Sequence, residues 1–281
     1  MNQVEYLQDK ARELRKNIVT MIYEAQSGHP GGALSCADIV SVLYFNTLNI
    51  RPADPKWSQR DRVILSKGHV CPVIYAALAM KGYFDLNVLH SLRKMGSILQ
   101  GHPDMKKVPG IDMTSGSLGQ GLSVGAGMAF GAKVQNLGNQ VYVILGDGEI
   151  QEGQVWEAAM MAAKYKLDNL IAIVDVNQLQ CDGFTYDIMP TEPLKGKWES
   201  FGWKVFEIDG HDIRQIMDTF EKVKEIKDRP VCILARTVKG KGISYMENIC
   251  EWHGKAPDEA QYKVALKDLG YEAGKGRTFN E

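Results

Sequence analysis

Residues 141–180 read VYVILGDGEIQEGQVWEAAMMAAKYKLDNLIAIVDVNQLQ and contain two short apolar runs separated by a helical segment. The first run ends in GDG at residues 146–148, and the second ends in DVN at residues 175–177. Continuous apolar strands that are joined by one helix are typical of parallel strands covered on both faces. This stretch therefore predicts a strand, helix, strand unit within an α/β sheet.

Asp147 and Asn177 follow directly after these two predicted strands, thirty residues apart. The carboxyl ends of neighbouring parallel strands lie at one edge of a sheet, where α/β proteins bind ligands. Asp147 stands between two glycines and before a helix whose free N–H groups suit a phosphate or diphosphate. A carboxylate, an amide oxygen and a main-chain carbonyl near Leu179 suit Mg²⁺ or Ca²⁺ if diphosphate oxygens complete the shell. An isolated GDG is more often a tight turn, but here the intervening unit would bring both side chains together.

The order GDG, then QEG, then a second strand ending in asparagine resembles the thiamine diphosphate signature. The form GDGEIQEGQVWEAA is similar to the transketolase branch of that superfamily, and the resemblance extends over nearly the whole chain. The signature often ends in two asparagines; Val176 stands at the first, and Asn177 stands at the second, which the family uses as a metal ligand. The resemblance implies thiamine diphosphate and Mg²⁺, for which Ca²⁺ or Mn²⁺ can substitute. It implies the metal ligands Asp147, Asn177 and Leu179, and the cofactor contacts Asp147, Gly148, Glu149 and Asn177.

Composition and charge limit the class of protein. The 281 residues are 44% hydrophobic and 24% charged, with a net charge of -1, which is an ordinary globular balance. The absence of a long basic run argues against nucleic acid or an anionic membrane as the main partner. No apolar run approaches the roughly eighteen residues of a membrane span. The five cysteines are scattered without a C-x-x-C pair, so no disulfide framework or zinc site is predicted, and a reducing cytoplasm is expected.

Four histidines lie in loops or at strand-to-helix corners. His29 is in SGHPGG, His69 in SKGH, His102 in GHPD and His253 in WHGK. A lone loop histidine is more often exposed or structural, but these four motifs resemble those of transketolases. The resemblance implies that all four are catalytic: His29 and His102 contact the substrate, His69 contacts the cofactor diphosphate, and His253 contacts both. Their imidazoles are expected to exchange protons near neutral pH.

The most glycine-dense loop is TSGSLGQG at residues 114–121. Its glycine spacing differs from the dinucleotide fingerprint G-x-G-x-x-G, and no clear strand precedes it, which disfavours a nicotinamide dehydrogenase. In transketolases the matching loop is usually GPLGQG and lines the aminopyrimidine and diphosphate region of the cofactor. The resemblance implies cofactor contacts by Gly116, Ser117 and Leu118, with Ser117 in place of the common proline.

Two acidic residues, Glu152 and Glu157, flank the start of the helix after GDG. Acidic side chains in a first helical turn can simply complement the helix dipole, which contributes about 0.3–1 kcal/mol. In the resembled family, carboxylates at these positions lie at the subunit interface and link two active sites. Glu152 is therefore expected to be catalytic. By contrast, His90, within a predicted helix, and His211, in the turn DGHD, are expected to be structural.

The rest of the chain alternates between helices and strands, which predicts one α/β domain with a doubly wound, mostly parallel sheet flanked by helices. It spans residues 1–281, with a lid and polar tail at about 239–281. KGKG at residues 239–242 is compatible with a basic phosphate loop but is expected to be a flexible hinge. Helices are predicted at residues 4–26, 35–45 with Ser35 as N-cap, 72–81, 86–95, 154–166, 195–201, 213–226 and 258–269, and from the glycine loop to about residue 134. Strands are predicted at residues 62–65, 141–145, 170–174, 204–208 and 231–236.

The resemblance implies carbanion chemistry carried by the cofactor, in which a two-carbon ketol unit passes from a ketose phosphate to an aldose phosphate. Transketolases need a second domain with a glutamate for the aminopyrimidine and arginines for the substrate phosphate, and the sequence ends before such a domain. The chain is therefore expected to be the amino-terminal subunit of a split transketolase. It would be inactive alone and would form a heterotetramer with two copies of a carboxy-terminal subunit.

Two other classes stay open. A component like 1-deoxyxylulose phosphate synthase or the keto-acid dehydrogenase E1 alpha chain shares GDG and the asparagine, but is not expected to combine SGHPG, GHPD, TSGSLGQG and WHGK. A non-catalytic cofactor-binding module would keep the diphosphate site without turnover. The intact histidines argue against such a module, and activity that depends on a partner would exclude it.

Overall fold

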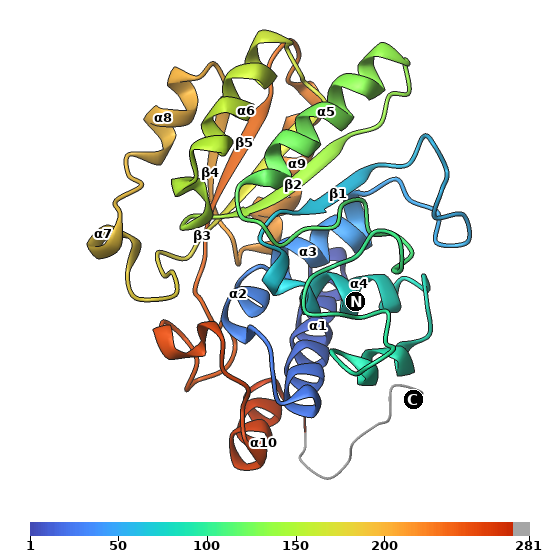
Figure 1. The fold of residues 1–281 in the computed structure, drawn as a ribbon, viewed down its shortest axis with the longest axis vertical. Coiled ribbons are helices and arrows are strands. Elements are labelled where there is room, and N and C mark those ends of the chain that lie inside the picture. Colours follow the sequence, from blue (N-terminus) through green and yellow to red (C-terminus); the bar gives the residue numbers. More distant parts are fainter. Residues whose placement is uncertain (272–281) are drawn as a thin grey trace.

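Five parallel strands form the centre of the protein in a computed structural model, which describes residues 1–271 (Figure 1). The strand order is β1-β2-β3-β5-β4, and every neighbouring pair is parallel. All residues of β2 and β3 are buried, as their continuous apolar sequences predicted. The predicted doubly wound α/β sheet is confirmed. The strands are β1 (Arg62–Leu65), β2 (Val141–Gly146), β3 (Leu170–Val176), β4 (Lys204–Asp209) and β5 (Val231–Arg236).

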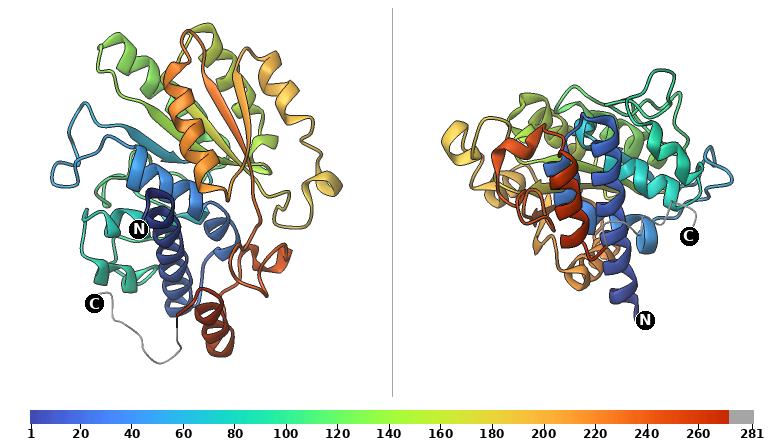
Figure 2. Two further views of the ribbon diagram at one scale, coloured as in Figure 1. Left: turned by 180° about the vertical axis from the view of Figure 1, so that it is seen from behind. Right: turned by 90° about the horizontal axis from the view of Figure 1, so that it is seen from below.

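Helices cover both faces of the sheet and form two separate apolar cores (Figures 1 and 2). Successive side chains of a strand point to opposite faces, so Val143 of β2 packs in one core and its neighbour Ile144 packs in the other. One face carries α5 (Gln120–Val134), α6 (Gly153–Lys164) and α8 (Leu194–Ser200); the other carries α1 (Gln3–Ala25), α3 (Ala37–Val42), α4 (Pro72–Met80) and α9 (Ile213–Glu225). Short helices α2 (Pro30–Ser35) and α7 (Thr185–Ile188) lie in the connections.

Two helix predictions in the first hundred residues are wrong. The predicted helix at 35–45 begins earlier, as α2 at Pro30, because proline suits the first position of a helix, and it breaks before α3. Ser35 is not an N-cap; its hydroxyl donates to the carboxylate of Asp175 at 2.5 Å. The predicted helix at 86–95 is only a 3₁₀ helix, Leu86–Ser91, because Arg93 has a φ of 60° and its N–H bonds to the carbonyl of Leu99.

The segment after β5 runs past α2 and returns to the amino-terminal helix. A short 3₁₀ helix, Cys250–His253, precedes α10 (Glu259–Asp268), which lies beside α1 in Figure 2. Tyr23 and Tyr262 stack there with their ring centroids 4.2 Å apart. The end of the predicted polar tail, residues 272–281, lies outside the described residues. Within residues 1–271, no helix combines the length and the apolar character of a membrane span.

Candidate functional site

A cavity of about 400 Å³ lies at the carboxyl ends of β1, β2 and β3. The strand ends bring together loops that are far apart in the sequence, as the βαβ topology requires. Ser117 is exposed and does not belong to the cavity wall, whereas its neighbours do. The wall includes these predicted site residues: His29, His69, His102, Gly116, Leu118, Asp147, Gly148, Glu149, Glu152, Asn177, Leu179 and His253.

The oxygens predicted to bind a metal are held by contacts with the main chain. Asp147 is 2% exposed, and its carboxylate accepts hydrogen bonds from the N–H groups of Gly148 at 2.9 Å and Gln178 at 2.5 Å. Asn177 Oδ1 accepts from the N–H of Leu179 at 3.1 Å. Asp147, Asn177 and Leu179 all line the cavity, so a carboxylate, an amide oxygen and a main-chain carbonyl are available from one part of its wall. Such a set of hard oxygens fits Mg²⁺ or Ca²⁺.

The charge on Asp147 is poorly compensated by the protein itself. Burial and the neighbouring carboxylate of Asp175 raise the pKa of Asp147 to about 6. A bound divalent cation would favour the charged form, so the residues present fit a metal. Residues 1–271 contain no cluster of three or more His, Cys, Asp or Glu side chains arranged to hold a metal ion. A cation at Asp147 would therefore need oxygens from a ligand, as a diphosphate provides.

Three of the predicted histidines form a triangular cluster. The ring centroid of His29 lies 5.1 Å from that of His69 and 5.5 Å from that of His253, and the other two are 5.2 Å apart. Burial lowers the pKa of His29 and His253 to about 4, helped by Arg93 and Lys239 respectively, and lowers that of His69 to about 2. Without a ligand, burial and the neighbouring charges therefore favour the neutral form of all three imidazoles, because a cation would be both desolvated and repelled. This direction is opposite to the expected titration near neutral pH.

Lys239 is a cavity residue that the sequence analysis did not assign to the site. It is 2% exposed, and its Nζ donates to the carbonyl of Leu179 at 2.9 Å and lies 2.8 Å from His253 Nδ1. Burial and the Lys67 ammonium lower its pKa to about 8. The side chain of Lys239 is thus held in the cavity wall, which the expectation of a flexible hinge at residues 239–242 did not include. Its position just after a buried strand, like that of Asp147, was a signal that could have found it.

Lys67 and Asp175, which were not predicted either, form an ion pair that is almost fully buried beside the cavity. Burial alone would raise the pKa of Asp175, but the Lys67 ammonium holds it below its usual range. Asp175 also accepts hydrogen bonds from the hydroxyls of Ser35 and Thr237. A carboxylate inside an apolar strand needs such partners. The position of Asp175 in an apolar run could therefore have predicted that it has buried partners.

Glu149 connects three loops of the cavity wall. Its Oε1 accepts from the hydroxyl of Ser66 at 2.5 Å and the N–H of Gly119 at 3.0 Å, while Oε2 accepts from the N–H of Gly146 at 3.0 Å. Gly119 has a φ of 80°, and a Cβ atom there would lie 2.7 Å from the Cβ of Glu152, so only glycine fits. The carboxylate of Glu149 therefore holds the glycine loop against the GDG turn.

Of the other acidic residues and histidines singled out in the sequence, only Glu152 lies at the cavity. Glu152 belongs to the cavity wall, whereas Glu157 is exposed on α6 and does not. His90 Nδ1 lies 2.6 Å from a carboxylate oxygen of Glu24, and His211 Nδ1 lies 2.7 Å from one of Asp38. Neither His90 nor His211 lines the cavity.

Known proteins provide an independent comparison with this geometry. A family model described as "Transketolase, thiamine diphosphate binding domain" matches residues 7–279. The 6-deoxy-6-sulfo-D-fructose transketolase subunit of Clostridium sp. (strain MSTE9) is 46% identical over 266 residues, which are 95% of this chain and 97% of that protein. An apulose-4-phosphate transketolase subunit of Phocaeicola vulgatus is 43% identical, and the alignment covers 95% of each chain.

Solved structures agree with the sequence comparisons. Transketolase from Campylobacter jejuni superposes with a TM-score of 0.91 at 35% identity. The alignment covers 97% of this chain but only 44% of the Campylobacter chain. The cavity, the family model and the structural match point to one conclusion: this chain belongs to the transketolase family and corresponds to its thiamine diphosphate-binding domain.

Proposed function

We propose that this chain is the amino-terminal subunit of a two-chain transketolase that uses thiamine diphosphate and Mg²⁺. The complete enzyme would transfer a two-carbon ketol unit from a ketose phosphate to an aldose phosphate. The observation that carries the proposal is the convergence of Asp147, Asn177 and three histidines on one cavity. Relatives of nearly the same length are named as transketolase subunits, which supports a division of the enzyme between two chains.

The polar wall of the cavity would hold the cofactor. Asp147, the Asn177 amide oxygen and the carbonyl of Leu179 would bind Mg²⁺, with the cofactor diphosphate completing the shell. The ammonium of Lys239 provides a buried positive charge beside the same carbonyl. When bound, thiamine diphosphate supplies the stabilised carbanion that carries the two-carbon unit.

The histidine cluster would supply hydrogen bonds to the substrate rather than positive charge. A neutral imidazole has one N–H donor and one nitrogen acceptor. Because the Lys239 ammonium donates to His253 Nδ1, the proton of His253 resides on Nε2, which can donate to a hydroxyl or oxyanion. His29 Nδ1 is buried and has no hydrogen-bond partner within the described residues. With His102, these groups would orient the substrate through hydrogen bonds to its hydroxyls.

The assembly and the substrate follow from the same proposal. We expect a carboxy-terminal subunit to complete the active site in a cytoplasmic heterotetramer with two copies of each chain. The five cysteines, all of them free, support a reducing compartment. Two relatives are named for 6-deoxy-6-sulfo-D-fructose and for apulose-4-phosphate, so the donor sugar is expected to be a ketose with an anionic group.

A reconstitution experiment tests this function. The chain is titrated with thiamine diphosphate and Mg²⁺ alone and after mixing with the subunit encoded beside it, and ketol transfer is then measured. Xylulose 5-phosphate, fructose 6-phosphate, 6-deoxy-6-sulfofructose and apulose 4-phosphate serve as donors. Turnover only in the mixture, abolished by Asp147→Ala, supports the proposal. Failure of the chain to bind the cofactor, alone and in the mixture, would refute it.

A further inference from the structure

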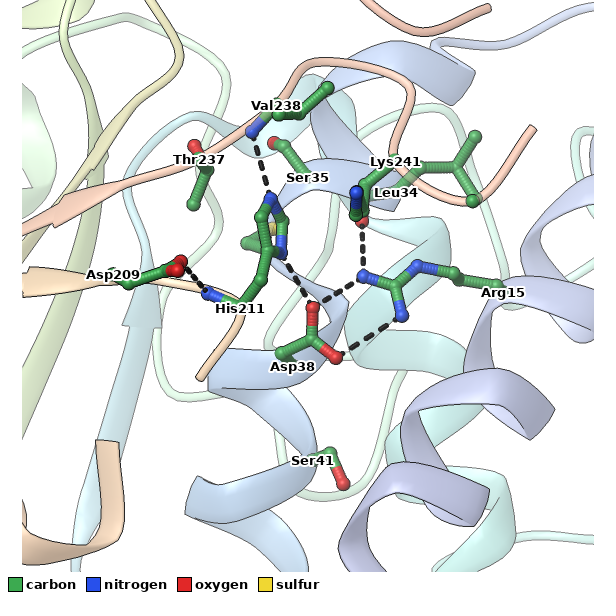
Figure 3. Close-up of polar contacts among 12 residues, drawn as sticks. Arg15, Leu34, Ser35, Asp38, Ser41, Asp209, His211, Thr237, Val238 and Lys241 are labelled. Atoms are coloured by element: carbon green, nitrogen blue, oxygen red, sulfur yellow. Dashed lines mark hydrogen bonds and ion pairs between the residues drawn. The ribbon is translucent and has the colours of Figure 1, made fainter. Parts of the chain in front are cut away.

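Arg15, Asp38 and His211 form a polar cluster, shown in Figure 3. None of the three lines the cavity. Arg15 donates to both carboxylate oxygens of Asp38, at 3.1 and 2.5 Å. His211 Nδ1 lies 2.7 Å from Asp38 Oδ2. The side chains of Arg15 and Asp38 are only 9% and 8% exposed. The cluster therefore ties α1 and α3 to the turn that leads into α9.

The other ring nitrogen of His211 contacts the main chain. His211 Nε2 accepts a hydrogen bond from the N–H of Val238 at 2.8 Å, as Figure 3 shows. An accepting Nε2 carries no proton, so the proton of the neutral imidazole is on Nδ1 and is donated to Asp38. Asp38, held in place by Arg15, thus stabilises the tautomer of His211 whose Nε2 can accept the N–H of Val238.

Val238 belongs to a short segment that leaves β5 and enters the cavity. On one side, the N–H of Thr237 donates to the carbonyl of Val176 at 3.1 Å, and on the other, the N–H of Gly240 donates to the carbonyl of Gly31 at 3.0 Å. The contact with His211 anchors Val238, the first of the two residues between them. The next residue is Lys239, whose ammonium reaches Leu179 and His253.

We propose that His211 is a positioning residue for Lys239. The imidazole fixes the peptide from which the Lys239 side chain enters the cavity, and Asp38 and Arg15 fix the imidazole. The consequence for cofactor binding rests on the proposed function, because the anion that Lys239 would meet is the cofactor diphosphate. The position of Lys239 itself is a property of this chain and can be measured without any ligand.

Three variants separate positioning from general stability. His211→Leu removes the acceptor for Val238 N–H, whereas His211→Gln can keep one, because the glutamine carbonyl can reach the position of Nε2. The matched control is Asp212→Ala, which removes the N-cap of α9 in the same turn but no contact with Val238. The Gln variant keeps the test valid if the Leu variant does not fold.

The first measurement uses the chain without cofactor. Hydrogen exchange at the Val238 amide is expected to be at least tenfold faster in His211→Leu than in the wild type, and unchanged in Asp212→Ala and His211→Gln. A crystal structure of His211→Leu should show the Lys239 ammonium displaced from Leu179 and His253. An unchanged amide exchange rate and an unmoved Lys239 would overturn the proposal, whatever the function of the protein.

The second measurement compares single and double variants of His211 and Lys239 by their affinity for thiamine diphosphate with Mg²⁺. His211→Leu should weaken binding about tenfold, and His211→Gln should restore most of it. Lys239→Met should weaken binding at least as much, and the double variant no further than Lys239→Met alone. Independent losses that multiply in the double variant would contradict action through Lys239. If the wild type itself binds no cofactor, the proposed function fails, while the amide and structural measurements still decide the positioning role.

Discussion

Asp175 accepts a hydrogen bond from Nδ2 of Asn177 at 3.0 Å, and this contact decides which end of the Asn177 amide faces the cavity. With Nδ2 turned toward Asp175, Oδ1 is left to receive the N–H of Leu179 and to face a cation. The same oxygen of Asp175 receives the Lys67 ammonium. The buried ion pair therefore orients a proposed metal ligand as well as satisfying its own charges.

Breaking this ion pair should be costly. In Lys67→Met, the carboxylate of Asp175 remains buried without its counter-charge, and the free energy of unfolding should fall by about 3–5 kcal/mol. Asp175→Asn should cost a similar amount because it leaves the ammonium unpaired. Chemical denaturation of both single variants and of the double variant is the measurement. The double variant should recover part of the loss; losses that simply add in the double variant would show that the pair is not coupled.

Asp147→Asn should separate stability from cofactor binding. The pKa of Asp147 is raised from 3.8 to about 6, so its charge destabilises the folded chain without a ligand at pH 8 by up to about 3 kcal/mol. The neutral amide removes that cost and the carboxylate that a cation needs, but it keeps only one acceptor for the N–H groups of Gly148 and Gln178, so the gain should be smaller than this limit. Denaturation at pH 8 should show a more stable variant, while titration with thiamine diphosphate and Mg²⁺ should show no binding. A variant that is less stable and still binds would contradict both assignments.

Glu149→Ala should loosen the glycine loop. Three donors, the Ser66 hydroxyl and the N–H groups of Gly119 and Gly146, lose their acceptor, and each buried donor left without a partner costs about 1–3 kcal/mol. Glu149→Gln keeps one carbonyl oxygen and should lose less. Denaturation and amide exchange at Gly119 measure the effect. Equal stability of the Ala and Gln variants would show that the carboxylate does not organise the loop.

The stability of the chain without ligand should fall as the pH is lowered from about 6.5 to about 4. The folded pKa values of His29 and His253 are about 4 and that of His69 about 2, so the unfolded chain binds these protons first and is favoured by acid. The raised pKa values of Asp61, Asp147 and Glu149 act in the opposite direction, but the pKa of His102 is also lowered, and four histidines outweigh three acids.

Thermal unfolding between pH 4.5 and 8 measures this dependence. His69→Gln is the informative variant, because it removes the histidine with the largest shift and should flatten the profile. His90→Gln, a histidine outside the cavity, serves as the control. A wild-type profile that is flat below pH 6.5 would contradict the burial of neutral imidazoles.

The sequence predicted those features that depend on local pattern and spacing. The apolar runs before Asp147 and Asn177 predicted two buried parallel strands, and parallel topology alone places both residues at one edge. Partnerships between distant side chains could not be derived in this way. Asp175 lies within an apolar run and Lys67 lies 108 residues away, and nothing in either local sequence specifies the other. Lys239 was not predicted to line the site because its glycine-rich neighbourhood is typical of a mobile loop.

The strand order has a consequence for how the protein is made. β5 lies between β3 and β4, so β4 has no neighbouring strand among the described residues until β5 is present. On a ribosome, residues 204–209 therefore emerge before residues 231–236 can pair with them. Lys239 and His253, which complete the cavity, are added later still. Open strand edges invite pairing with other chains. The topology thus leaves the nascent chain open to mispairing until β5 is made, and the cavity is complete for cofactor loading only after His253 has been added.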